Sequence, residues 1–330
     1  MTHDKLVKVS FCGDIMCLRE ETEARRQRFG RLDYTDYVSS VRPLLNNSDY
    51  VVGNLETPVS MSHDLSTEAI NFNSPIDFLQ VVGDVGFNFL STANNHCLDR
   101  GVSGIEETIK AIDSLGIKHD GTYLSRDDAE ALRVVDVARV KIAIICSTFG
   151  TNSQHNGVVL AKEDEWRVAL LKKQPKKKHY PFRFDSKQNE LEYLADDVSP
   201  VAISNPVNEA YLSNILSKIN QAKQIADIVV AMPHVGGQYN PAPATYAKYV
   251  IGKMKYAGAD MIIAGHSHTP HRCEWLDSCF IAYSLGNLCF TPNVGFYVRN
   301  VLADYGIVLH VYIDVVTKKL TALLLMSSRT

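Results

Sequence analysis

The sequence has no long apolar run, no strong net charge and no cysteine motif, and each absence narrows the possible functions. No apolar segment of signal-peptide length precedes the first candidate strand, and none elsewhere approaches membrane-spanning length. We therefore expect a cytoplasmic protein without a membrane partner. The formal net charge of −3, from 34 basic and 37 acidic residues, gives no global reason to expect nucleic acid as a partner.

The seven cysteines are odd in number and lack C-x-x-C spacing. Several lie in apolar strand candidates, which favours small buried thiols in a reducing compartment over metal ligands or nucleophiles. No internal repeat, low-complexity tract or heptad pattern is present. The 330 residues, 45% of them hydrophobic, suffice for one large domain or two small ones. We interpret residues 1–330 as a single domain.

Strand and helix candidates alternate along the chain, as in layered α/β proteins. Short apolar runs predict strands at residues 7–12, 50–52, 89–92, 228–232 and 261–264, with a hairpin at 132–137 and 141–146. Helical spacing predicts helices at residues 34–45, 75–82, 104–115, 212–225 and 246–256, and residues 19–31 are helical or looped. Strands at 280–284, 306–315 and 320–326 favour an antiparallel portion of sheet.

A basic segment interrupts this alternation at about residues 151–206. It contains Lys172, Lys173, a further lysine run and Arg183, with little strand pattern. We interpret it as an insertion over the main sheet. A solvated loop with a helix at 163–171 is favoured over a basic lid that contacts substrate.

Polar residues follow the apolar strand candidates with unusual regularity. Functional side chains in layered α/β proteins gather beyond the carboxyl ends of strands, so these residues are expected to converge. Carboxylate, amide and imidazole groups together suit Zn, Mn or Fe better than an all-oxygen calcium site. Each also has an ordinary structural explanation, as a cap, a turn residue or a buried histidine. The residues are Asp14, Asn54 or Glu56, Asn95 with His96, His234, and His266 with His268.

The order of short motifs resembles a known family. The motifs are G-D-I-M, N-L-E, A-N-N-H-x-x-D-x-G, P-H-x-G, G-H-S-H and Y-S-L-G-N, spanning about residues 10–290. In this order they resemble the CapA family of bacterial capsule and poly-γ-glutamate synthesis proteins, which is similar to the calcineurin-like metallophosphoesterases. The resemblance implies an α/β fold: a four-layer α-β-β-α sandwich with mixed sheets and a site for one or two divalent metal ions at one end.

The resemblance also implies individual roles. Asp14 is similar to the first metal aspartate of the phosphoesterases, Asn95 to the metal-binding asparagine, and His96 to the adjacent histidine that assists the leaving group. His234 is similar to the lone metal histidine, and His266 and His268 to the final pair, one for each metal.

Two positions depart from the phosphoesterase pattern. Met16 stands where that pattern has a histidine ligand, and Asn54 follows Gly53 where a bridging aspartate is expected. Glu56 is the nearest carboxylate and is interpreted as the replacement ligand. Whether the two departures disable a two-metal site stays open.

Further residues are assigned to catalysis and to substrate binding. His96 is expected to donate a proton or to stabilise developing negative charge. Asp99 either orients His96 or caps the helix that begins near residue 101, and we favour the cap. Arg100 and the lysines of the insertion are expected to attract an anionic small molecule, peptide or polymer. Substrate contacts are predicted for Asn54, Asn94, Arg100 and Asn287.

Three hypotheses follow for the function. The first is a soluble metal-dependent hydrolase of a phosphoester or an amide-linked acidic peptide or polymer. The second is a non-catalytic accessory protein in capsule or poly-γ-glutamate biosynthesis, although members of that family commonly carry a membrane anchor, which we do not expect here. The third is a peptide epimerase that uses the same cleft. The sequence gives no oligomeric state.

Overall fold

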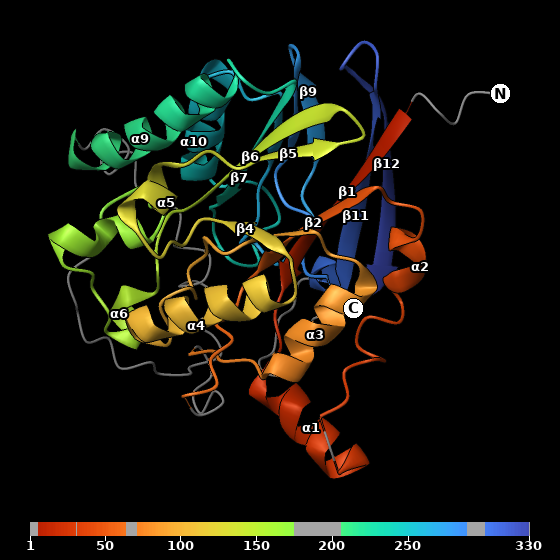
Figure 1. The fold of residues 1–330 in the computed structure, drawn as a ribbon, viewed down its shortest axis with the longest axis vertical. Helices are drawn as coiled ribbons and strands as arrows, with labels where there is room; N and C mark the ends of the chain where they lie inside the picture. Colours follow the sequence, from red (N-terminus) through yellow and green to blue (C-terminus); the bar gives the residue numbers. More distant parts are fainter. Residues whose placement is uncertain (1–5, 31, 64–70, 175–205, 289–300, 330) are drawn as a thin grey trace.

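The computed structural model describes residues 6–30, 32–63, 71–174, 206–288 and 301–329. Two mixed six-stranded sheets pack against each other, and helices cover their outer faces (Figure 1). The first sheet has the order β12-β11-β1-β2-β3-β4. Its strands are β1 (Leu6–Ile15), β2 (Tyr50–Leu55), β3 (Phe89–Ser91), β4 (Lys118–Asp120), β11 (Tyr305–Asp314) and β12 (Leu320–Arg329).

The second sheet has the order β5-β6-β7-β8-β10-β9. Within it, β6, β7, β8 and β10 run parallel, whereas β5 and β9 are antiparallel edge strands. In the first sheet, β1 to β4 are parallel and β11 and β12 are antiparallel. The second sheet consists of β5 (Val134–Val137), β6 (Val140–Thr148), β7 (Ile228–His234), β8 (Met261–Ile263), β9 (Cys273–Leu276) and β10 (Cys279–Ala282).

The helices of the described residues pack mainly on the two outer faces. In Figure 1, α9 and α10 lie on one side of the sandwich, and α3 and α4 lie on the other. The helices are α1 (Arg19–Phe29), α2 (Arg42–Leu45), α3 (Ile76–Val85), α4 (Gly101–Ser114), α5 (Arg126–Glu130), α6 (Ser153–Asn156), α9 (Pro206–Ala222) and α10 (Thr245–Tyr256), with 3-10 turns η2 (Lys162–Arg167) and η4 (Val301–Asp304).

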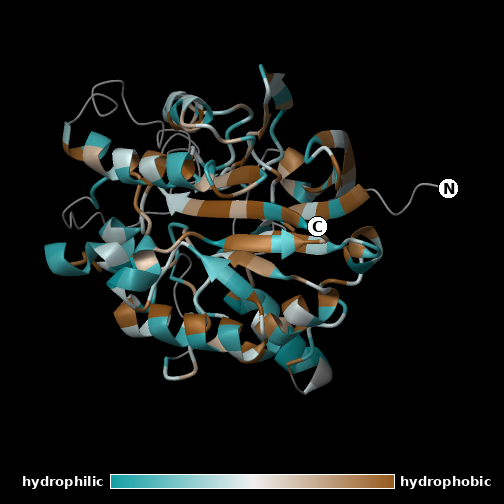
Figure 2. Ribbon diagram, turned by 45° about the horizontal axis from the view of Figure 1, so that its top comes forward, coloured by the Kyte–Doolittle hydropathy of each residue, from teal (hydrophilic) through white to brown (hydrophobic). Residues whose placement is uncertain are grey.

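The period-two alternation of each strand accounts for the layers. In β6, Ile142 and Ile144 point into the core between the sheets, whereas Ala143 and Ile145 pack against the layer of α9 and α10. Both faces of the central strands are therefore buried, which explains their nearly continuous apolar runs. Figure 2 shows the same pattern, with hydrophobic strands inside and helices that are hydrophobic along one side. The four-layer α/β sandwich predicted from the sequence is confirmed.

Two helix predictions are wrong because contacts with distant parts of the chain override the local pattern. Of residues 34–45, only Arg42–Leu45 is helical; the preceding turns are held by a hydrogen bond from the Tyr37 hydroxyl to the carbonyl of Met16. Of residues 163–171, the first part forms η2. The remainder is extended, because its backbone bonds to that of Gly121 and Thr148.

The C-terminal strands confirm the expected antiparallel portion only in part. Strands β11 and β12 are antiparallel as predicted, but β10 runs parallel to β8 and pairs antiparallel with β9, which was not predicted. Residues 175–205 of the expected insertion, with most of its lysines, lie outside the described residues. Within the described part of the chain, no helix is both long and apolar enough to cross a membrane.

The six described cysteines form no disulfide. Five are buried, and burial raises the pKa of Cys97 and Cys279 to about 12. Such thiols stay protonated near neutral pH and are poor nucleophiles and poor metal ligands. The expectation of structural thiols agrees with these environments.

Candidate metal centre

Asp14 occupies the end of β1, where two loops meet. Gly13 permits this approach, since a Cβ there would lie 1.9 Å from the carbonyl oxygen of Gly286. The Asp14 backbone donates to that carbonyl at 2.9 Å and accepts from the Leu288 amide at 2.8 Å. The Asn54 side-chain amide donates to Asp14 Oδ1 at 2.8 Å. The buried carboxylate of Asp14 is therefore held from several directions.

The turn after β8 brings two imidazoles to the same place. His266 and His268 have φ angles of 92° and 54°, in the left-handed region that non-glycine residues rarely adopt. The His266 amide donates to Asp14 Oδ2 at 3.1 Å, which ties this turn to β1. Two such residues in one turn mark a position where the surrounding structure enforces an unfavourable backbone, as is common at functional sites.

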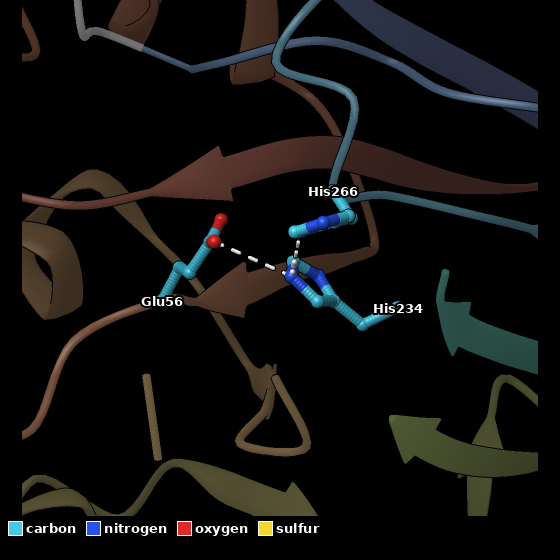
Figure 3. A group of neighbouring side chains, drawn as sticks. All are labelled: Glu56, His234 and His266. Atoms are coloured by element: carbon cyan, nitrogen blue, oxygen red, sulfur yellow. Dashed lines mark hydrogen bonds and ion pairs between the residues drawn. The ribbon is translucent and has the colours of Figure 1, made fainter. Parts of the chain in front are cut away.

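Glu56, His234 and His266 form the first cluster of possible metal ligands (Figure 3). Glu56 Oε1 lies 3.3 Å from His234 Nε2, and His266 Nδ1 lies 3.1 Å from the same His234 atom. Asn95 Oδ1 also approaches His234 Nε2, at 2.7 Å. One carboxylate, two imidazoles and one amide oxygen thus converge from four different strand ends.

Asp14, Glu56 and His268 form a second cluster that shares Glu56 with the first. His268 Nδ1 lies 3.6 Å from Asp14 Oδ2, and His268 Nε2 lies 3.7 Å from Glu56 Oε1. Asn287 Oδ1 lies 2.9 Å from His268 Nδ1, so it can accept a hydrogen bond from a protonated Nδ1. The lone pair of Nε2 is then available to bind a metal. Within each cluster the possible ligand atoms lie within 4.8 Å of one another.

The electrostatic state of these groups tests whether a cation fits. Glu56 is fully buried, and among the described residues neither of its carboxylate oxygens finds a hydrogen-bond donor; His266 Nε2 also has no hydrogen-bond partner among them. Burial, with the neighbouring Asp14 carboxylate, raises the pKa of Glu56 well above its ordinary value. Burial lowers the pKa of His234 to about 4 and that of His266 well below its ordinary value, so both imidazoles are neutral at pH 7. Neutral imidazoles beside an unpaired buried carboxylate fit a divalent cation.

His96 and Asp99 form a hydrogen-bonded pair beside these clusters. His96 Nδ1 lies 2.6 Å from Asp99 Oδ2, which also accepts from the Phe72 amide at 2.7 Å. The expected capping role of Asp99 is wrong: Arg100 is the N-cap of α4, and no side chain in the described part of the chain caps the start of this helix. The carboxylate is instead used to orient His96, whose ring stacks on Phe72 at 3.9 Å between centroids.

The other residues singled out in the sequence differ in where they lie relative to the two clusters. Asn54 and Asn94 lie in the site as a linked pair, with the Asn94 amide donating to Asn54 Oδ1 at 3.2 Å and to the Leu55 carbonyl at 2.7 Å. Asn287 lies beside His268. The Arg100 guanidinium donates to the side chain and carbonyl of Asn71. Met16 is buried against Leu18 and Phe72.

Residues that the sequence did not reveal complete the surroundings of the histidines. The Asn156 amide donates to Asp99 Oδ1 at 3.1 Å, and Asn152 Nδ2 lies 3.4 Å from His96 Nε2. Phe149 contacts the His266 ring at 4.6 Å and Tyr239 the His268 ring at 5.5 Å between centroids. No local pattern distinguishes these four residues, because their roles arise from long-range packing.

The fold of this chain has a counterpart among solved structures. A solved structure of similar fold is a candidate 5′-nucleotidase from Staphylococcus aureus in complex with alpha-ketoglutarate, with a TM-score of 0.52 and 11% sequence identity. The match covers 98% of this chain and 55% of that one. At this identity the likeness concerns the fold alone.

The chain belongs to the family of bacterial capsule synthesis proteins PGA_cap, whose profile matches residues 8–292. It is 27% identical over 289 residues to the PGA biosynthesis protein CapA of Bacillus subtilis, and 28% identical over 288 residues to the capsule biosynthesis protein CapA of Bacillus anthracis. These matches cover 87% and 86% of this chain but only 64% and 59% of the relatives. The resemblance to the CapA family is confirmed.

Proposed function

We propose that this protein is a metal-dependent hydrolase that acts on a phosphoester or on an amide-linked acidic peptide or polymer. The observation that carries the proposal is the buried Glu56 carboxylate, which accepts no hydrogen bond from any described residue and is shared by two clusters of possible ligands. Burial of an isolated carboxylate has a large free-energy cost unless a cation compensates its charge.

The ligands in this proposal are Asp14, Glu56 and His268 in one cluster, and Glu56, Asn95, His234 and His266 in the other. Their mixture of oxygen and imidazole donors is compatible with Mn, Zn or Fe. A divalent ion in such a site supplies Lewis-acid activation of water and of the scissile group. Met16 contributes no imidazole, so the cluster around Asp14 has fewer donors than the cluster around His234.

In this proposal His96 is the proton donor to the leaving group. Asp99 accepts from Nδ1, which fixes the ring and leaves Nε2 as the atom that exchanges a proton with the substrate. The stacked Phe72 ring and the low exposure of His96, at 3%, keep bulk water away from this imidazole. Asn54 donates to Asp14, and Asn287 Oδ1 lies within hydrogen-bond distance of His268 Nδ1, so both asparagines can position these ligands. The substrate contacts expected of them from the sequence stay predictions.

Metal add-back and a substrate screen test this proposal. The purified protein is stripped with chelator, loaded with Mn, Zn or Fe, and assayed on phosphomonoesters, phosphodiesters and glutamyl peptides. We expect metal-dependent turnover by the wild type, and we expect His96→Ala to retain the metal while losing most turnover. Equal turnover by the stripped and loaded forms would refute metal dependence, and full activity of His96→Ala would refute its role as proton donor.

The names of the relatives support a second proposal, in which the protein is a non-catalytic accessory factor in capsule biosynthesis. The same site would then bind an acidic polymer without cleaving it. Polymer binding by the loaded protein, without cleavage of any substrate in the screen, favours this alternative. Deuterium incorporation from solvent without cleavage instead favours the epimerase hypothesis.

The cytoplasmic location stays a prediction, which cell fractionation tests.

A further inference from the structure

Residues 168–171 run alongside the end of β6 and determine where the next residue lies. The Thr148 amide donates to the Ala169 carbonyl at 2.9 Å, and the Leu171 amide donates to the Thr148 carbonyl at 2.8 Å. Leu170 and Leu171 are buried, which anchors the segment. The backbone of Lys172 is therefore held next to Phe149, the residue that follows Thr148.

Phe149 links Lys172 to the candidate metal centre. Its backbone amide donates to the His234 carbonyl at 3.1 Å, and its ring centroid lies 4.6 Å from that of His266. The Lys172 ammonium lies 4.9 Å from the Phe149 ring centroid and 5.4 Å from that of Tyr246. The Lys172 cation thus lies over two aromatic rings, one of which contacts His266.

We propose that Lys172, positioned by Phe149 and Tyr246, is a subsite for a second anionic group of the substrate, separate from the group that reacts at the metal centre. The inference rests on the proposed function and narrows it to substrates with at least two negative groups. The ammonium can form a charge-assisted hydrogen bond with a carboxylate or a phosphate. The aromatic faces limit the freedom of the lysine, so less conformational entropy is lost when the anion binds.

This subsite favours an acidic chain over a simple monoester. A chain with an acidic group on every unit places one group at Lys172 while the neighbouring unit occupies the metal centre. A monoester with a neutral leaving group carries no second negative group that could bind Lys172. The same chemistry would serve a carboxylate or a phosphate on the second unit, and the probes below separate the two.

Equilibrium binding to the metal-loaded protein tests the subsite. Triglutamate, its side-chain amide analogue triglutamine and triphosphoserine are titrated calorimetrically at low salt. The variant Lys172→Met removes the charge but keeps an apolar stem against the rings, and Lys172→Arg keeps the charge. Lys253→Met is the matched control, because the Lys253 ammonium lies 5.4 Å from the Tyr249 ring centroid on α10.

We expect Lys172→Met to weaken binding of the preferred acidic peptide at least tenfold, and Lys172→Arg and Lys253→Met to stay within about threefold of the wild type. Triglutamine should bind weakly and equally to all four proteins. A preference for triglutamate or for triphosphoserine identifies the anion. Equal affinity of Lys172→Met and wild type, or no preference of the wild type for either acidic peptide over triglutamine, would overturn the proposal.

Turnover measured on the same samples separates this inference from the proposed function. Binding that depends on Lys172 without any cleavage refutes the hydrolase and leaves the subsite standing. Cleavage of an acidic peptide with the same KM in wild type and Lys172→Met refutes the subsite and leaves the hydrolase standing.

Discussion

Glu56 Oε1 lies 3.3 Å from His234 Nε2, and yet neither oxygen of this fully buried carboxylate accepts a hydrogen bond from the part of the chain that the structure describes. Burial lowers the pKa of His234 to about 4, so at neutral pH the imidazole gives the carboxylate no compensating charge. The pair is arranged as two ligands of a common cation would be, and it joins the clusters around His234 and His268.

Substitution of His266 by asparagine is expected to remove most bound metal while leaving the fold intact. Asparagine is chosen because it tolerates the left-handed backbone at this position, where φ is 92°, better than alanine does. Metal content by elemental mass spectrometry and the unfolding free energy in chelator are the two measurements. Metal stoichiometry equal to that of the wild type would exclude His266 as a ligand.

The Asp99→Asn substitution is expected to lower turnover by about a hundredfold or more, since the neutral amide cannot stabilise a protonated His96 and has one acceptor oxygen where the carboxylate has two. Metal content should not change. Asn156→Ala, which removes a weaker hydrogen bond to the same carboxylate, should have a smaller effect in the same direction. An Asp99→Asn variant as active as the wild type would show that the pair has no catalytic role.

Gly13→Ala is expected to destabilise the protein by about 2 kcal/mol or more, because the added methyl group would overlap the Gly286 carbonyl. Gly252 in α10 has open space around it, and Gly252→Ala should stabilise by about 0.5–1 kcal/mol through helix propensity. Denaturant unfolding of both variants measures the difference. Equal stability of the two would contradict the close contact between β1 and the turn at Gly286.

Much of the site was predictable from local patterns, because apolar runs followed by glycine and polar residues mark strand ends. That reasoning placed Asp14, His234 and His266 correctly at one edge of the sandwich. It failed where the contacts are long-range. The position of Asp99 in the sequence is typical of a helix cap. In the folded chain, its carboxylate instead accepts a hydrogen bond from the Phe72 amide and pairs with His96.

The segment at residues 163–171 shows the same limit. Its spacing is typical of a helix, but hydrogen bonds to Gly121 and Thr148 draw its second half into an extended path. This path places Lys172 against Phe149, a contact with no local signature. Asn152 and Asn156 were likewise missed, because they lie in a segment that was interpreted as a loop over the sheet.

His310 predicts a pH dependence of stability away from the candidate metal centre. Its side chain is buried in β11, with Nδ1 2.7 Å from Ser10 Oγ. Burial, with the charge of Lys8, lowers its pKa from 6.5 to about 4. Between these values the unfolded chain binds the proton and the folded chain does not, so stability is lost as the pH falls from 6.5 towards 4.

The substitution His310→Gln removes this titration. The free energy of unfolding of the wild type should therefore fall by about 1 kcal/mol or more relative to the variant as the pH falls from 7 to 4. Denaturant titrations of both proteins across this range provide the measurement. Parallel profiles would show that His310 titrates alike in the folded and unfolded chains.

The metal content of Glu56→Gln shows whether this one carboxylate serves both clusters of ligands. Wild type, Glu56→Gln and Glu130→Gln, a control at an exposed glutamate at the end of α5, are loaded with Mn, Zn or Fe, desalted and measured by elemental mass spectrometry. We predict near-stoichiometric metal in the wild type and the control, and loss of most metal in Glu56→Gln, since one carboxylate serves both clusters. A wild type that holds no metal, or a Glu56→Gln variant that holds as much as the wild type, would rule out Glu56 as a ligand shared by the two clusters.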